Sequence, residues 1–180
     1  MKRKLLGLIS LLFAGAITSC SSYDASEYKA NSPKLDIKSY LDGNITAHGM
    51  IFDWKGKASR HFIATIKGEW EGENGTLTEH FAYSDGQEQD RIWQIKFSDE
   101  HNFTATAGDV IGDATGTQYG NAVNMSYVLR HKDTDGSTID VTIDDWLFLT
   151  SEGVLLNRSK IYKLGIPVGE VFISFTKDKE

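Results

Sequence analysis

The sequence predicts an all-β protein: an antiparallel up-and-down barrel of about 8–10 strands, preceded by a signal peptide and a flexible tether. Segments after residue 40 alternate apolar and polar residues with a period of two, which is typical of an antiparallel sheet with one covered face. Turns rich in Gly, Asn and Asp separate these segments at short intervals. The 180-residue chain contains 17 glycines, and no helical period of useful length follows the N-terminal segment.

Residues 1–19 resemble a bacterial lipoprotein signal peptide. Residues 2–4 are basic, and residues 5–17 form an apolar run shorter than the roughly 20 residues that a membrane-spanning helix needs. Residues 17–20 read Ile-Thr-Ser-Cys, which matches the lipobox motif. We therefore expect cleavage before Cys20 and lipidation of this residue, which is the only cysteine of the chain.

An ordinary secretory signal is the alternative, and it would leave Cys20 as a lone thiol in an oxidising compartment. The next residue is Ser21 rather than the Asp that retains lipoproteins in the inner membrane of enteric-type bacteria. This favours the periplasmic face of the outer membrane, with the lipid on Cys20 as the membrane contact. Residues 20–39 are polar and without a period, so we expect a lipidated cysteine followed by a flexible tether.

The charge of the mature chain limits its partners. Removal of residues 1–19 takes away three of the 19 basic residues and none of the 25 acidic ones, so the formal net charge becomes −9. An acidic chain without a basic run is a poor candidate for nucleic-acid binding. Acyl chains, rather than a basic patch, must then hold it at a membrane.

The barrel domain is expected over residues 40–177. Each predicted strand places apolar residues on one face and polar residues on the other, and closure of the sheet would remove its free edges. The clearest examples are residues 91–97, 123–130, 137–149 and 171–176.

Glycines recur at every fourth position from Gly108 to Gly120. One interpretation is a mobile loop over the mouth of a cavity. The other, which we favour, is a glycine-kinked strand that bends at a barrel corner.

Charged residues fall on the apolar faces of three predicted strands. Asp145 and Glu79 each alternate with apolar residues, and Arg91 could pair with Glu79. The loop near residues 85–86 must then contain an odd number of residues or a bulge. Such a cluster is either a polar centre that recognises a ligand headgroup or a charge-paired structural element.

Other chemistry has little support in the sequence. None of the five histidines pairs at a metal-ligand spacing, so we expect no metal site, and no motif indicates a cofactor. No Gly-x-Ser-x-Gly elbow is present. Glu79 and Asp145 could form the carboxylate pair of an enzyme, but this signal is weak, and we expect a monomeric binding protein rather than an enzyme.

Several longer motifs carry a family resemblance. They are residues 40–43, 75–86, 91–93, 144–149, 156–158 and 169–171. Together they resemble the DUF3833 family of proteobacterial lipoproteins of unknown function, from about Tyr40 to the C-terminus. The resemblance implies a lipocalin-like barrel, no established activity, and a lipid role hinted at by frequent gene proximity to lipid-modifying enzymes. His48 and Asn44 depart from the family pattern, which has an aromatic residue and a proline there.

Three hypotheses follow. The first is a lipid-anchored barrel that binds a small apolar or amphiphilic ligand such as a lipid or fatty acid. The second is a structural or assembly role at the outer membrane without a ligand, and the third is a carboxylate-based enzyme. For the first, the candidate cavity residues are Glu79, Tyr83, Arg91, Trp93, Tyr127 and Asp145 from strand faces, with Asn157 and Arg158 from the family motif.

Overall fold

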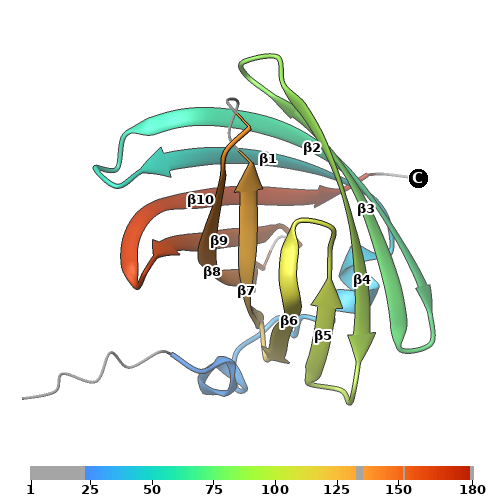
Figure 1. The fold of residues 1–180 in the computed structure, drawn as a ribbon. Coiled ribbons are helices and arrows are strands. Elements are labelled where there is room, and N and C mark those ends of the chain that lie inside the picture. Colours follow the sequence, from blue (N-terminus) through green and yellow to red (C-terminus); the bar gives the residue numbers. More distant parts are fainter. Residues whose placement is uncertain (1–22, 133–135, 152, 179–180) are drawn as a thin grey trace, which may run out of the picture.

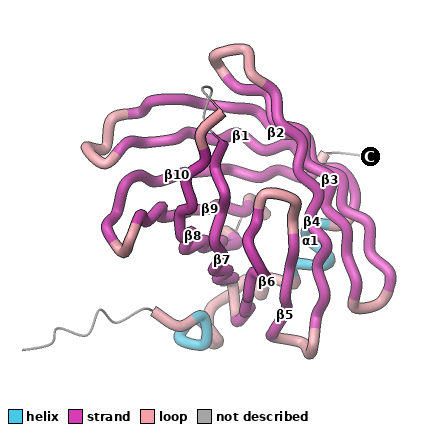
Figure 2. Tube along the Cα trace, viewed as in Figure 1, coloured by secondary structure: helices cyan, strands magenta, loops and turns pink. Residues whose placement is uncertain are grey.

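The computed structural model describes residues 23–132, 136–151 and 153–178, which form a closed antiparallel barrel (Figure 1). Strands make up nearly all of it, and two short helical segments precede them (Figure 2). The segments are the 3-10 helix η1 (Ala25–Tyr28) and α1 (Ile37–Leu41). The strands are β1 (Gly43–Asp53), β2 (Ala58–Glu71), β3 (Asn74–Tyr83), β4 (Glu88–Phe97), β5 (Asn102–Thr106), β6 (Val110–Tyr119), β7 (Ala122–Lys132), β8 (Thr138–Leu149), β9 (Leu155–Lys163) and β10 (Ile166–Lys177).

The strands follow one another around the barrel in chain order, and β1 closes it against β10. Ile45 of β1, for example, lies opposite Ile66 of β2 on one side and Lys177 of β10 on the other. Closure gives every strand two hydrogen-bonded neighbours and leaves no free sheet edge. The predicted all-β class and up-and-down topology are confirmed, with ten strands.

Side chains alternate between the barrel interior and solvent, as the sequence pattern predicts. In β4, Trp93, Ile95 and Phe97 are buried, whereas Gln94 and Lys96 are exposed. Burial of each large apolar side chain contributes roughly 1.5–3 kcal/mol. The inward faces of the strands therefore supply both the core and the walls of any internal cavity.

Residues 23–39 differ from the predicted flexible tether. Asp24 caps η1 by accepting a hydrogen bond from Ser26 N–H at 2.8 Å. Tyr28 of η1 packs edge-on against Phe148 on the outside of β8, with ring centroids 5.2 Å apart. The tether prediction is therefore wrong for residues 23–39, and residues 20–22, including Cys20, lie outside the described residues.

α1 covers one end of the barrel. Ile37 and Leu41 are buried and line the interior. The Tyr40 hydroxyl lies 3.0 Å from Phe175 O and accepts a hydrogen bond from Leu155 N–H at 3.2 Å. These contacts join α1 to β9 and β10, so the folded domain includes α1 and begins before residue 40.

The glycine-rich segment is a kinked strand and not a loop. It contributes β6, whose register against β7 shifts between Ile111 and Thr115, where Gly112 adopts a φ of +71°. Gly116 lies so close to the ring of Phe103 that an added Cβ would come within 2.1 Å of it. The favoured interpretation therefore agrees with the structure.

No helix in the described ranges is long and apolar enough to cross a membrane.

Candidate functional site

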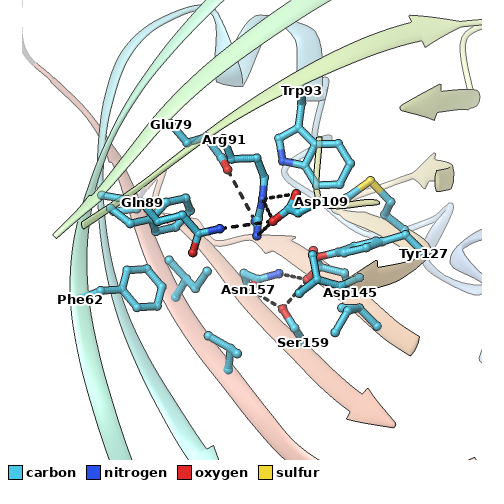
Figure 3. Close-up of a pocket in the computed structure, with 18 of the residues that line it drawn as sticks. Phe62, Glu79, Gln89, Arg91, Trp93, Asp109, Tyr127, Asp145, Asn157 and Ser159 are labelled. Carbon is cyan, nitrogen blue, oxygen red and sulfur yellow. Dashed lines mark hydrogen bonds and ion pairs between the residues drawn. The ribbon is translucent and has the colours of Figure 1, made fainter. Parts of the chain in front are cut away.

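The barrel encloses a cavity of about 800 Å³. One end is closed by buried residues of α1. At the other end the lining includes the exposed residues Gln87, His131 and Val168, and we call this end the mouth. The walls are mainly apolar, and a group of polar side chains lies between the two ends (Figure 3).

Glu79 and Arg91 face each other across neighbouring strands. They are direct partners in the β3–β4 register, because Ala82 pairs with Glu88 and the loop of residues 83–87 contains an odd number of residues. The expected shared face is therefore confirmed. Glu79 Oε2 lies 3.8 Å from Arg91 Nη1, which is an ion pair but too long for a hydrogen bond.

Asp109 is the principal partner of Arg91. Its Oδ2 accepts from Arg91 Nη2 at 2.7 Å and its Oδ1 accepts from Nε at 3.1 Å, a bidentate arrangement (Figure 3). Gln89 Nε2 also donates to Asp109, at 3.3 Å. The sequence analysis did not identify Asp109 as a site residue. The only signal near it was the glycine-rich segment, which begins at the preceding residue, Gly108.

Asp145 belongs to a second polar group on the opposite wall. Its Oδ1 accepts from Ser159 Oγ at 2.6 Å and also from Asn157 Nδ2. Asp144 turns to the other face of β8, where Asn124 Nδ2 donates to it at 2.8 Å. Asp145 and Asn157 thus line the cavity as expected, and Ser159 is an additional member that only the strand register reveals.

Aromatic side chains surround these polar groups. Trp93 and Tyr127 pack edge to face with ring centroids 5.4 Å apart, and both line the cavity. Tyr83 lies nearer the mouth, where the guanidinium of Arg60 is 3.5 Å from its ring centroid. The predicted positions of Trp93, Tyr127 and Tyr83 on the cavity wall agree with the structure.

Arg158 does not line the cavity. It follows inward-facing Asn157 on β9, so it points outward, where it donates to Glu170 Oε1 at 2.8 Å and lies over the ring of Phe172. Its assignment as a cavity residue was wrong, because both Asn157 and Arg158 of the family motif were assigned to the cavity although consecutive residues of a strand face opposite sides.

Burial dominates the ionisation of the polar groups. It raises the pKa of Glu79 to about 7, although the charge of Arg91 and a hydrogen bond with Trp93 act in the opposite direction. Burial also raises the pKa of Asp145, against hydrogen bonds from Ser159 and Asn157. Burial raises the pKa of Tyr127 well above its usual value, and the charge of Asp145 adds to this shift.

Burial disfavours the charge of Arg91, but the neighbouring carboxylates Glu79 and Asp109 more than compensate and raise the pKa of the guanidinium. Arg91 is therefore a permanent cation whose charge is balanced inside the protein. Among the described residues, no group of three or more His, Cys, Asp or Glu side chains could hold a metal ion.

The closed ten-stranded barrel and its internal cavity define an antiparallel barrel of the lipocalin-like class. The chain belongs to the family described as "Protein of unknown function (DUF3833)", whose model matches residues 14–177. The comparison with curated proteins gives no match.

Two solved structures share the fold. One is the S-type phycobiliprotein lyase CPES from Guillardia theta, with a TM-score of 0.58 and 7% identity over 80% of this chain and 92% of that one. The other is Rv2717c from M. tuberculosis, with a TM-score of 0.56 and 14% identity over 83% of this chain and 99% of that one. At such low identity these likenesses show the fold alone.

Proposed function

We propose that this protein is a lipid-anchored envelope protein that binds a small apolar or amphiphilic ligand, such as a lipid, inside its barrel. The observation that carries this proposal is the cavity of about 800 Å³ with mainly apolar walls and a small polar group. Small-molecule sites commonly have volumes of roughly 300–1,000 Å³ and the same combination of apolar walls and a few polar groups. The solved structures support the proposal only through the fold.

The proposed location is the periplasmic face of the outer membrane, with Cys20 as the lipid-bearing residue. The support is the lipobox and Ser21 in the sequence. Intact mass measurement of the membrane-extracted protein should show acyl chains on the mature N-terminus, and Cys20→Ala should lack them. An unmodified Cys20 in the native protein would contradict this part of the proposal.

Ligand binding can be tested on soluble residues 21–180, which retain every described element because the first begins at Ala25. We expect native mass spectrometry of this chain, purified from a bacterial periplasm, to show a bound lipid of defined mass. Leu129 lines the cavity, so Leu129→Trp should weaken lipid binding and reduce the adduct, because the larger indole narrows the space for the ligand. Ile92→Trp is the matched control, because Ile92 is exposed on the outer wall of β4.

A chain that carries no adduct before or after incubation with envelope lipids would contradict ligand binding. Loss of the adduct in Ile92→Trp as well would show that the lipid binds the outer wall and not the cavity. Thermal unfolding of both variants establishes that each is folded.

An assembly role is the second candidate, and exposed apolar residues near the mouth favour it. Trp54 follows β1 and is 72% exposed, while Leu164 and Ile166 in the β9–β10 hairpin are 90% and 66% exposed. Pairing of Asp53 with Gly169 places these two turns next to each other. Large exposed apolar side chains on adjoining turns are typical of contact surfaces.

A photo-crosslinking residue at position 164 should form one discrete adduct with an envelope protein in cells if the protein has this assembly role. The same residue at position 92, on a different strand, is the control. Equal crosslinking at both positions, or none at position 164, would count against the role.

A carboxylate-based enzyme has weaker support. Glu79 has a raised pKa inside a cavity, a feature of many catalytic acids and bases. Burial, which outweighs the opposing charge of Arg91, explains this shift without catalysis, and we therefore propose a binding protein. Turnover of any envelope lipid that is lost in Glu79→Gln would reverse this preference.

A further inference from the structure

The polar centre of the cavity carries more acidic than basic groups. Glu79, Asp109 and Asp145 supply three carboxyl groups, and Arg91 is the cation among them. Two of the basic residues nearer the mouth have partners of their own: Arg60 pairs with Asp85 at 2.8 Å and Arg130 with Asp140 at 2.9 Å, and Lys132 lies at the exposed rim.

Arg91 is poorly placed to receive a ligand anion. Asp109 occupies two of its donors, and Glu79 provides a second negative neighbour. A carboxylate or phosphate headgroup would have to displace Asp109 or add another negative charge to the cluster. Like charges within about 4–6 Å strongly disfavour each other's ionised form in a buried site.

Glu79 instead has one oxygen without a donor, although Trp93 hydrogen-bonds to its carboxyl group. Its Oε2 is buried and accepts no hydrogen bond in the structure, and Arg91 Nη1 is 3.8 Å away. A buried acceptor without a donor costs roughly 1–3 kcal/mol, which a ligand donor would recover. On the opposite wall, Ser159 and Asn157 both donate to Oδ1 of Asp145, which leaves Oδ2 as another acceptor.

We propose that this cavity selects amphiphiles with a cationic amine headgroup, held between Glu79 and Asp145, over fatty acids and other anionic amphiphiles. This inference rests on the proposed ligand-binding function and names the ligand class. The alkyl chain would lie against the apolar walls, which include Ile37 and Leu41 of α1 and Phe62 and Val171 of the strands. A fatty acid, one of the ligands expected from the sequence, does not match this charge distribution.

The geometry also predicts a pH dependence. Glu79 interacts with one cation, two acids and two phenols. They are Arg91 of β4, Asp109 in the turn before β6, Asp145 of β8, Tyr127 of β7 and Tyr83 of β3. The Glu79 pKa of about 7 means that its carboxyl group ionises between pH 6 and 8. An alkylamine stays protonated there, so its affinity should rise by up to about tenfold over this interval.

The experiment compares three amphiphiles of one chain length on residues 21–180. Dodecylamine, dodecanol and dodecanoate are titrated against bound N-phenyl-1-naphthylamine, an uncharged fluorescent probe of apolar cavities. At pH 8 dodecylamine should displace the probe at a concentration at least about tenfold lower than dodecanoate does. Dodecanol should fall between them.

Glu79→Gln should reduce this preference for the amine and its pH dependence. Glu69→Gln is the matched control, because Glu69 is an exposed acid on the outer wall of β2 that pairs with Lys67, and it should keep both. If Glu79→Gln does not fold, Asp145→Asn and the pH series of the unaltered chain provide the same test.

The results distinguish failure of the amine preference from failure of the proposed ligand-binding function. If the probe binds and dodecanoate displaces it as well as dodecylamine does, the amine preference is wrong and the proposed function stands. If neither the probe nor any of the three amphiphiles binds, the proposed function fails and the amine preference fails with it.

Discussion

Glu79 couples the stability of the barrel to pH. Its pKa is about 7 in the folded chain, compared with an ordinary value of 4.5, because it is buried. Between these two pH values the folded chain holds a proton that the unfolded chain releases, so the free energy of unfolding falls as pH rises through this window. The shift corresponds to about 3 kcal/mol.

Glu79→Gln should therefore flatten the dependence of stability on pH between 4.5 and 7, and at pH 8 it should exceed the unaltered chain in stability. Urea unfolding at several pH values measures this. A residual slope of the same sign will remain, because burial also raises the pKa of Asp145. Glu69→Gln makes the same charge change on the outer wall and should retain the full slope; equal slopes in all three chains would contradict the prediction.

Asp109 stabilises the barrel by balancing the positive charge of Arg91 and accepting its hydrogen bonds. Asp109→Ala removes both strong hydrogen bonds and leaves the guanidinium with Glu79 at 3.8 Å. Because the pair is partly exposed, we expect a loss of about 2–3 kcal/mol in the free energy of unfolding, measured in urea. Asp109→Asn keeps an acceptor and should lose less; an equal loss in the two variants would show that hydrogen bonding to Arg91 is not the cause.

Strand alternation was sufficient to predict Glu79, Arg91, Trp93 and Asp145 as cavity residues. Strand alternation could not predict contacts between residues that are distant along the chain. Asp109 precedes β6, two turns along the chain from Arg91, and only the closed barrel brings the two together. Alternation would also have corrected the assignment of Arg158, since its neighbour Asn157 faces inward.

At the scale of elements, η1 depends on one glycine. Gly120 has a φ of +56°, and an added Cβ would come within 1.8 Å of Tyr28 O. Gly120→Ala should therefore displace η1 from the barrel. We expect faster proteolytic cleavage within residues 23–35, together with a destabilisation of about 1–3 kcal/mol.

Gly56→Ala is the control that separates the effect of backbone strain from the effect of the clash with Tyr28. Gly56 also has a positive φ, +77°, but no neighbouring atom lies within 4 Å of its added Cβ. This variant should be strained without a change in cleavage of residues 23–35. Similar cleavage of both variants would mean that the Tyr28 contact does not hold η1 in place.

The helical elements were not predictable because they are too short to show a period. η1 has four residues, of which Ala25 is buried, and α1 has five, of which Ile37, Tyr40 and Leu41 are buried. Their positions depend on distant parts of the barrel, as when Leu35 N–H donates to Gly120 O at 2.7 Å. The strands were predictable because each is long enough to repeat its inward and outward alternation several times.

At the scale of the whole molecule, the sequence predicts a barrel but cannot show whether it is hollow. An inward-facing residue gives the same alternation whether it fills the interior or lines a cavity. The difference depends on the volumes of side chains from all ten strands together. Here small inward residues such as Ala47, Ala64 and Ala105 lie among the lining residues and leave room for the cavity.

A hollow barrel should be stabilised by any molecule that fills it. A ligand that binds only the folded chain adds about 2.7 kcal/mol at 100 times its Kd, which raises the Tm of a chain of this size by roughly 5–10 °C. N-phenyl-1-naphthylamine should produce this shift with residues 21–180 and with Ile92→Trp, measured by circular dichroism. Leu129→Trp should show a smaller rise in Tm, because its indole takes part of the space that the probe would fill. A rise that Leu129→Trp leaves unchanged and Ile92→Trp abolishes would place the probe on the outer wall, and then the cavity would not be the source of the stabilisation.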